Sequence, residues 1–447
     1  MDIKKLVIVP MAALVLSSGA GFAQAEEMHE QMPTVETEAV ELRGTLDHLL
    51  SEHAFLAAEA MRKGADGAAD FENITAALDQ NTTELSAAIE SVYGEEAGMQ
   101  FKEMWSSHIG YFVDYVNGTA EDDDAAKEEA LDELSQYRED FSMFLETATE
   151  ERVEADALAE GLQMHVEQLI GAFDAYVMGD YETAYAYERE AVHHMYMVSK
   201  GLSSAITDQF PEQFNNTKAV TPAADLRSDL NYLFSEHAGL AAMTMQNGIE
   251  GSEDFEASAA ALNNNTKDLA QAVTAVYGEE AGMQFEKMWT EHIGYFVDYV
   301  TATAEEDTAA QEEALANLDM YKEEFSMFMD TATDGNLPAE ALAEGLQMHV
   351  EQLIGAFDAY SAEDYQVAYE QTREAYHHMF MTSKGLSGAI VKQMPDQFMM
   401  EMPAEMPNTA MAPPADDNNN MLLISIFASL VLLTAVMITL RIRKERN

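Results

Sequence analysis

The chain has no cysteine among its 447 residues, so it can form neither disulfide bonds nor thiolate metal sites. Basic residues are also scarce, with 23 Lys and Arg against 81 Asp and Glu and a formal net charge of −58. Nucleic acid and anionic lipid are bound by clusters of Lys and Arg, so this charge excludes both as natural partners. A saline habitat and a specific cationic partner are the two explanations of the acidity.

Catalytic motifs are absent as well. The sequence contains no nucleophile elbow, no Gly-rich phosphate loop and no Cys/His pair. It also lacks alternating runs of β-branched residues, which are typical of strands, while Ala, Leu, Met and Glu are abundant. These absences predict an all-α protein that is not an enzyme.

Both ends of the chain resemble targeting signals. Residues 1–25 combine two lysines, an apolar run and a small-residue cleavage site, which is the layout of a secretory signal peptide. Residues 421–440 carry no charge and are long enough to span a bilayer, although a buried core helix is the alternative. The tail, 441–447, is basic, and positive residues stay on the cytoplasmic side. We expect a single-pass protein of the cell membrane, held in its own membrane by one C-terminal transmembrane helix, with its N-terminal part outside the cytoplasm.

Most of the remaining chain is one module written twice, as residues 37–208 and 224–392. Equivalent positions are 184 residues apart, and the stretch LAEGLQMHVEQLIGAFDAY occurs unchanged in both copies. A Pro- and Asn-containing linker, 209–223, separates the copies, and a Met/Pro-rich stalk, 393–420, follows them. The apolar spacing predicts helices in the first copy at about 37–63, 69–92, 95–118, 122–148, 154–178 and 180–206, each recurring in the second. Short joints make neighbouring helices antiparallel, so we expect two tandem six-helix bundles of antiparallel helical hairpins.

Ten of the twelve histidines occupy positions that the two copies share. These are His53, His108, His165, His193 and His194, with His237, His292, His349, His377 and His378 as their counterparts. The other two are His29, before the first copy, and His48, whose counterpart is Tyr232 and which we exclude from a shared site. The first three lie 55 and 57 residues apart, each in the first helix of a hairpin. Three hairpins around one axis would bring these three imidazoles to one level of the core.

Methionine is abundant near these histidines. The neighbours within one turn include Met104, Met164 and Met197, with Met288, Met348 and Met381 as their counterparts. Thioether and imidazole together suit copper, particularly Cu(I). Packing is the other explanation, since methionine fills cores well. The methionines of the stalk have little core to fill, and either copper capture or an apolar linker explains them.

Iron offers a second metal hypothesis. Glu190 precedes His193 by three residues, and Glu374 precedes His377 likewise, which is the Glu-x-x-His spacing of di-iron helical bundles. Such bundles need two of these pairs, and each copy has one. Haem is a third hypothesis, in which Gly161 leaves room one turn before His165.

Several blocks of the sequence resemble a family of exported bacterial helical-repeat proteins. They are SEHAFLAAEAM, VYGEEAGMQFKEMW, HIGYFVDYV, MHVEQLIGAFDAY and REAVHHMYM. Members of that family often carry the automatic label copper amine oxidase. The label does not imply the activity here, because such oxidases build a quinone from Tyr in an Asn-Tyr-Asp/Glu setting. The only Asn-Tyr in this chain, Asn231-Tyr232, is followed by Leu233.

The sequence therefore predicts a membrane-anchored, extracytoplasmic metal-binding protein that handles copper through His/Met sites in each repeat. The metal ion is the expected partner, and no protein partner is indicated. A structural or adhesive surface protein of a halophile is the alternative, and iron or haem binding in a helical bundle is a further one.

Overall fold

The computed structural model describes residues 32–399, which are helical almost throughout. This part of the chain contains twelve α-helices and two short 3-10 helices, and no strand. The first repeat comprises α1 (Glu38–Asp66), α2 (Phe71–Tyr93), α3 (Glu95–Ala120), α4 (Asp124–Ala148), α5 (Ala155–Val177) and α6 (Tyr181–Gln209). The second comprises α7 (Pro222–Glu250), α8 (Phe255–Tyr277), α9 (Glu279–Ala304), α10 (Thr308–Ala332), α11 (Ala339–Ser361) and α12 (Tyr365–Gln393). The expected all-α class and the six helices of each copy are confirmed.

Local chemistry explains where the helices begin and end. Thr37 accepts a hydrogen bond from the backbone of Val40 and so caps α1, and Thr221 caps α7 in the same way. Gly94 joins α2 to α3 with φ 89° and ψ 169°. This conformation has a positive φ but lies outside the left-handed helical region. Almost only glycine adopts this conformation, so the joint needs this residue.

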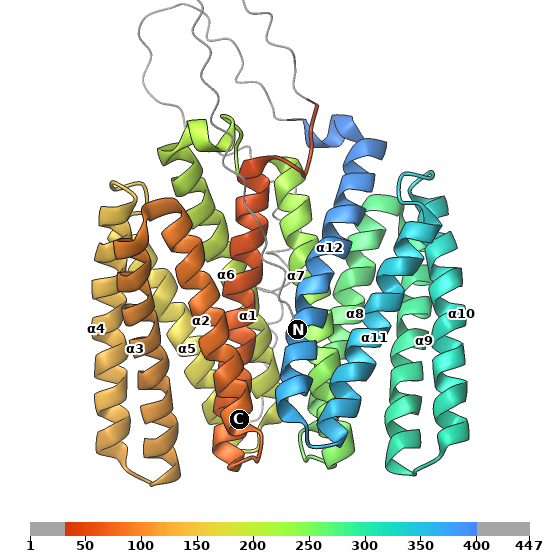
Figure 1. Ribbon diagram of the computed structural model, residues 1–447, viewed down its shortest axis with the longest axis horizontal. Helices are drawn as coiled ribbons and strands as arrows, with labels where there is room; N and C mark the ends of the chain where they lie inside the picture. The colour runs from red at the N-terminus through yellow and green to blue at the C-terminus, as the bar shows by residue number, and fades with distance from the viewer. Residues whose placement is uncertain (1–31, 400–447) are drawn as a thin grey trace, which may run out of the picture. The chain divides into compact units, whose positions relative to one another are not determined.

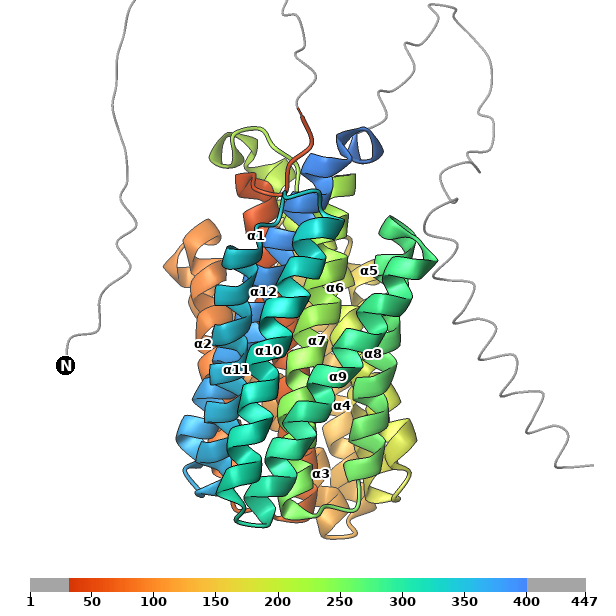
Figure 2. The ribbon, with the colours of Figure 1, turned by 90° about the vertical axis from the view of Figure 1, so that its right-hand side faces the viewer.

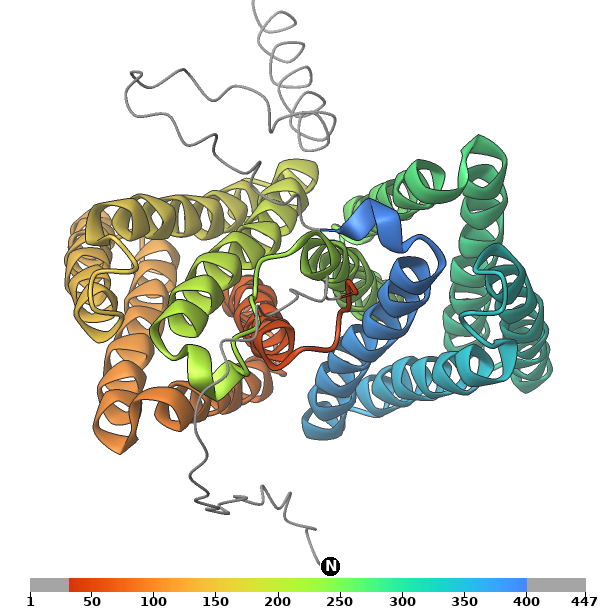
Figure 3. The ribbon, with the colours of Figure 1, turned by 90° about the horizontal axis from the view of Figure 1, so that it is seen from above.

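Successive helices run antiparallel and stand side by side (Figures 1 and 2). α3 and α4 lie at one edge of the molecule and α9 and α10 at the opposite edge, while α1 and α7 lie at the centre. Viewed from above, the two repeats meet along α1, α6, α7 and α12 (Figure 3). Residues 32–399 belong to one compact unit, so the repeats pack against each other although a linker joins them. That either six-helix set forms a bundle by itself stays a prediction.

The central helices α1 and α7 form the core, and they bury charged residues such as Glu52 and Glu236 together with apolar ones. Every residue of 49–63 in α1 and of the equivalent stretch 233–247 in α7 is buried. A helix that buries all its faces must be enclosed by others. α1 accordingly contacts α2, α3, α5, α6, α7 and α12.

Ion pairs exchanged between the repeats hold this interface. Arg373 of α12 lies 2.8 Å from Glu52 of α1, and Arg189 of α6 lies 2.9 Å from Glu236 of α7. The two pairs are equivalent under the 184-residue repeat. They are nearly buried, and a buried charge is tolerated when it is paired. Each repeat therefore neutralises a buried carboxylate of the other.

The expected signal peptide, transmembrane span and basic tail, and nearly all of the stalk, lie outside the described residues. Within 32–399, none of the helices is long and apolar enough to cross a membrane.

Candidate metal centre

Three histidines of the first repeat converge in its interior. His53 comes from α1, His108 from α3 and His165 from α5, and one ring nitrogen of each lies within 4.8 Å of the other two. The Nε2 atoms of His53 and His108 are 3.3 Å apart. All three side chains are buried, with at most 4% of any residue exposed. The expectation that the three hairpins bring these histidines to one level is confirmed.

The second repeat carries a copy of the same cluster. His237 of α7, His292 of α9 and His349 of α11 also have ring nitrogens within 4.8 Å of one another. The Nε2 atoms of His237 and His292 are 3.4 Å apart, and all three residues are buried. In the described part of the chain, these two triads contain histidine alone, without a carboxylate.

Aromatic rings enclose each triad. Trp105 lies 4.7 Å, between ring centroids, from both His53 and His108. Tyr137 stacks on His108 at 4.7 Å, and Phe112 presents its edge to His165. The second repeat has the same arrangement around Trp289 and Tyr321. These walls keep the surroundings of the imidazoles apolar.

Burial in apolar surroundings keeps the imidazoles neutral. It lowers the pKa of His108 to about 3, with the proximity of His165 adding to the effect. Burial also holds the pKa of His53 and His165 well below the usual value, and each is further lowered by a neighbouring histidine. The second triad behaves alike. A neutral imidazole has a free lone pair, so the triads are ready to bind a metal near neutral pH without losing protons.

Many of the buried nitrogens have no hydrogen-bond partner. Both ring nitrogens of His165 and both of His349 lack a hydrogen-bond partner in the protein. Leaving a buried polar atom unpaired costs about 1–3 kcal/mol. Histidines that only stabilised a core would satisfy their nitrogens, so the unpaired atoms of His165 and His349 favour a ligand at the centre of each triad.

His193 and His377 lie elsewhere, at the interface between the repeats. His193 stacks on Tyr232 of α7 at 4.4 Å, and His377 stacks on His48 of α1 at the same distance. His48 thus takes the place of Tyr232 in an equivalent contact, and its exclusion from the triads agrees with this position. Neither His193 nor His377 belongs to the converging groups.

His194 and His378 also stay outside the triads. Nε2 of His378 is 2.9 Å from the carbonyl oxygen of Gly345, and His194 faces the equivalent Gly161. The space beside Gly161, in which the sequence suggested room for haem, is therefore occupied by His194. Burial lowers the pKa of both histidines.

The methionines divide into two groups. Met164, Met197, Met348 and Met381 are 46–63% exposed, so they neither fill the core nor reach the triads. Met104 and Met288 are partly buried and pack against the core.

Two methionines that were not among our candidate ligands are buried and line cavities that reach the triads. Met195 and Met379 are 2% and 3% exposed. Met195 lines a small apolar cavity of about 30 Å³ together with His108 and His165, and Met379 lines its counterpart with His349. Their shared position directly after each His-His pair is the sequence signal that could have identified them.

The glutamates of the di-iron hypothesis do not join the triads. Glu190 and Glu374 are exposed on α6 and α12. Glu52, which directly precedes His53 in α1, is held instead by Arg373 and Asn81. Its pKa is lowered to about 2, because the contacts with His48 and Arg373 outweigh the effect of burial.

Comparison with family models, curated proteins and solved structures finds no match to this chain. The functional assignment therefore depends on the geometry of the two triads.

Proposed function

We propose that this protein binds metal in an extracytoplasmic compartment, with one copper ion, as Cu(I), in each His triad. The observation that carries the proposal is the convergence of three buried, neutral imidazoles with unpartnered nitrogens, in both repeats. Three imidazoles around one point form a trigonal donor set, and imidazole is a common ligand of copper.

The charge of the site favours a monovalent ion. The triads contain no carboxylate to balance a cation, and their walls are aromatic. The cost of moving an ion into a low-dielectric interior grows with the square of its charge, so a divalent ion costs about four times as much as Cu(I). Cu(I) also accepts thioether sulfur, and Met195 lines the same small cavity as His165. Zinc and iron lack both advantages here.

The location is part of the proposal. A signal peptide at 1–25 and a span at 421–440 would hold the repeats outside the cytoplasm, where the methionines of the stalk could capture copper. The resemblance to exported helical-repeat proteins agrees with this placement. We propose binding and handling of the ion, without a catalytic step.

Metal titration of the full-length chain tests the proposal. Purified in high salt and freed of metal, the protein is titrated with Cu(I), Cu(II), Zn(II) and Fe(II). Beyond the Cu(I) that the stalk takes up in every variant, the chain should bind two Cu(I) ions, His165→Ala and His349→Ala should each bind one, and the double variant none. His193→Ala is the matched control and should bind two. Uptake by the double variant equal to that of the parent would overturn the proposal and leave a surface scaffold as the function.

A further inference from the structure

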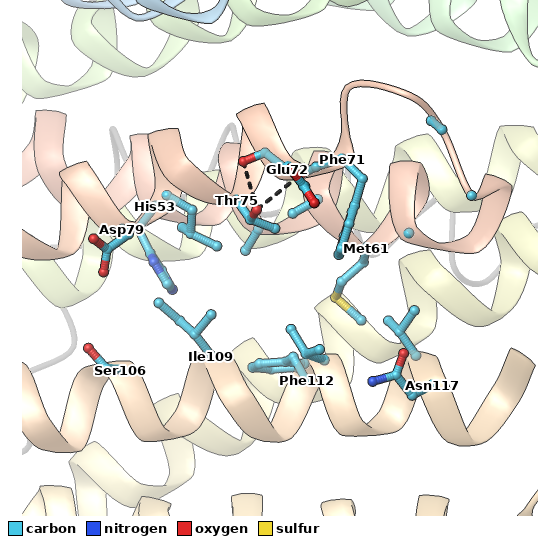
Figure 4. Close-up of a pocket in the computed structure, with 18 of the residues that line it drawn as sticks. His53, Met61, Phe71, Glu72, Thr75, Asp79, Ser106, Ile109, Phe112 and Asn117 are labelled. Carbon is cyan, nitrogen blue, oxygen red and sulfur yellow. Dashed lines mark hydrogen bonds between the residues drawn. The ribbon is translucent and has the colours of Figure 1, made fainter. Parts of the chain in front are cut away.

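The triad of the first repeat is closed to solvent, so an ion needs a path to it. A cavity of about 490 Å³ lies between α1, α2 and α3, and His53 lines one end of it (Figure 4). His53 is also a member of the triad, whose nitrogens lie within 4.8 Å of one another. The cavity therefore reaches one of the three ligands.

The lining of the cavity combines exposed carboxylates with apolar side chains. Glu72 and Asp79 of α2 belong to the lining and are exposed. Met61, Ile109 and Phe112 point into the space between the helices (Figure 4). Exposed carboxylates raise the local concentration of cations, whereas apolar walls disfavour a hydrated divalent ion.

Two residues that line the cavity offer donor atoms that suit Cu(I). Met61 is 5% exposed and offers a thioether to the cavity, and His53 offers an imidazole. These are the donor types that bind Cu(I). An ion that loses its water at the mouth can pass from sulfur to nitrogen and then to His108 and His165.

We infer that this cavity is the route by which Cu(I) enters and leaves the triad of the first repeat, with Met61 as an intermediate ligand. The inference rests on the proposed function, because a route requires a site. It concerns the rate of loading and not the number of ions bound.

The chain supplies its own reporter and its own control positions. It has two tryptophans, and Trp105 lies 4.7 Å from two histidines of the first triad. Thr75 lines the cavity and bonds only to backbone carbonyls of its own helix, so a larger side chain there removes no tertiary contact. Its equivalent in the second repeat is Ala259.

The test measures Cu(I) loading by stopped-flow quenching of tryptophan fluorescence. The parent is the full-length chain carrying His349→Ala, so that only the first triad loads. Adding Thr75→Phe should slow loading by about tenfold, equal to about 1.4 kcal/mol in the barrier, with an unchanged endpoint. Ala259→Phe in the same parent should leave the rate unchanged.

A second variant separates the thioether from the volume of the cavity. Met61→Leu conserves volume and should also slow loading, whereas the equivalent Met245→Leu should not. An unchanged rate in both Thr75→Phe and Met61→Leu, equal slowing by Ala259→Phe, or a reduced endpoint would overturn the route. A parent that shows no loading at all would overturn the proposed function and the route together.

Discussion

Replacing His165 with leucine should make the metal-free protein more stable, contrary to the usual effect of changing a buried residue. Both ring nitrogens of His165 are buried without a partner. Each unpaired atom costs about 1–3 kcal/mol, and leucine removes both. A change of shape at nearly constant volume costs less than about 1.5 kcal/mol. Removing both atoms gains about 2–6 kcal/mol, so after the packing cost we expect a net gain of at least about 0.5 kcal/mol in the free energy of unfolding.

The same substitution should halve the stabilisation that metal gives. A ligand at 100 times its dissociation constant stabilises the folded state by about 2.7 kcal/mol for each site. The parent should gain from two sites and His165→Leu from one. His349→Leu is the matched control and should give the same two results.

Thermal unfolding followed by far-ultraviolet circular dichroism checks both effects, once with a copper chelator and once with excess Cu(I). A loss of 2 kcal/mol or more without metal would refute the reasoning. It would mean that His165 is an ordinary packing residue whose nitrogens are satisfied by bound water.

Other predictions concern the pH range, the thioether and the interface. Because burial lowers the pKa of His108 to about 3, no proton leaves the triads when a metal binds. The Cu(I) affinity, measured by competition with a chelator, should therefore stay constant from pH 5.5 to 8. A steep fall in affinity below pH 6.5 would contradict this. The free energy of unfolding, in contrast, should depend on pH. The unfolded imidazoles protonate below about pH 6.5 while the native ones do not, so this free energy should fall as the pH is lowered from 6.5 to 4. His108→Phe, followed by urea unfolding, should weaken that dependence, and an unchanged slope would contradict the assignment. Met195→Leu should lower Cu(I) affinity by about tenfold in competition titrations and leave Zn(II) affinity unchanged, whereas equal losses for both metals would indicate a packing role. Arg373→Met should lower the free energy of unfolding by about 3 kcal/mol, because it leaves the buried Glu52 carboxylate without its guanidinium partner. Adding Glu52→Gln should restore part of that loss. A single variant as stable as the parent would show that the pair contributes little.

The helices were predictable because their signals are local. Ala, Leu and Glu favour helix wherever they occur, and apolar residues three and four apart mark one buried face. The predicted 95–118 and 122–148 correspond to Glu95–Ala120 and Asp124–Ala148. The triads were also predictable, because nearly equal spacings of 55 and 57 residues in equivalent hairpins place the histidines at similar depth.

The methionines that we predicted as ligands were misplaced for a geometric reason. Consecutive residues of a helix point 100° apart, and residues two apart point nearly opposite ways. Met195 and Met197 are thus on opposite faces of α6, the first 2% and the second 63% exposed. Proximity to histidine in sequence did not show which of the two faces the core.

By itself, the sequence determined the helical class, the 184-residue repeat, the acidic surface and the level at which His53, His108 and His165 lie. These follow from composition and period, which act through local backbone preference and burial. The tertiary structure alone decided that His193 and His377 belong to the interface, and that Arg189 and Arg373 neutralise carboxylates of the opposite repeat. Those contacts join residues 39 to 329 positions apart, and no local pattern encodes which helix faces which.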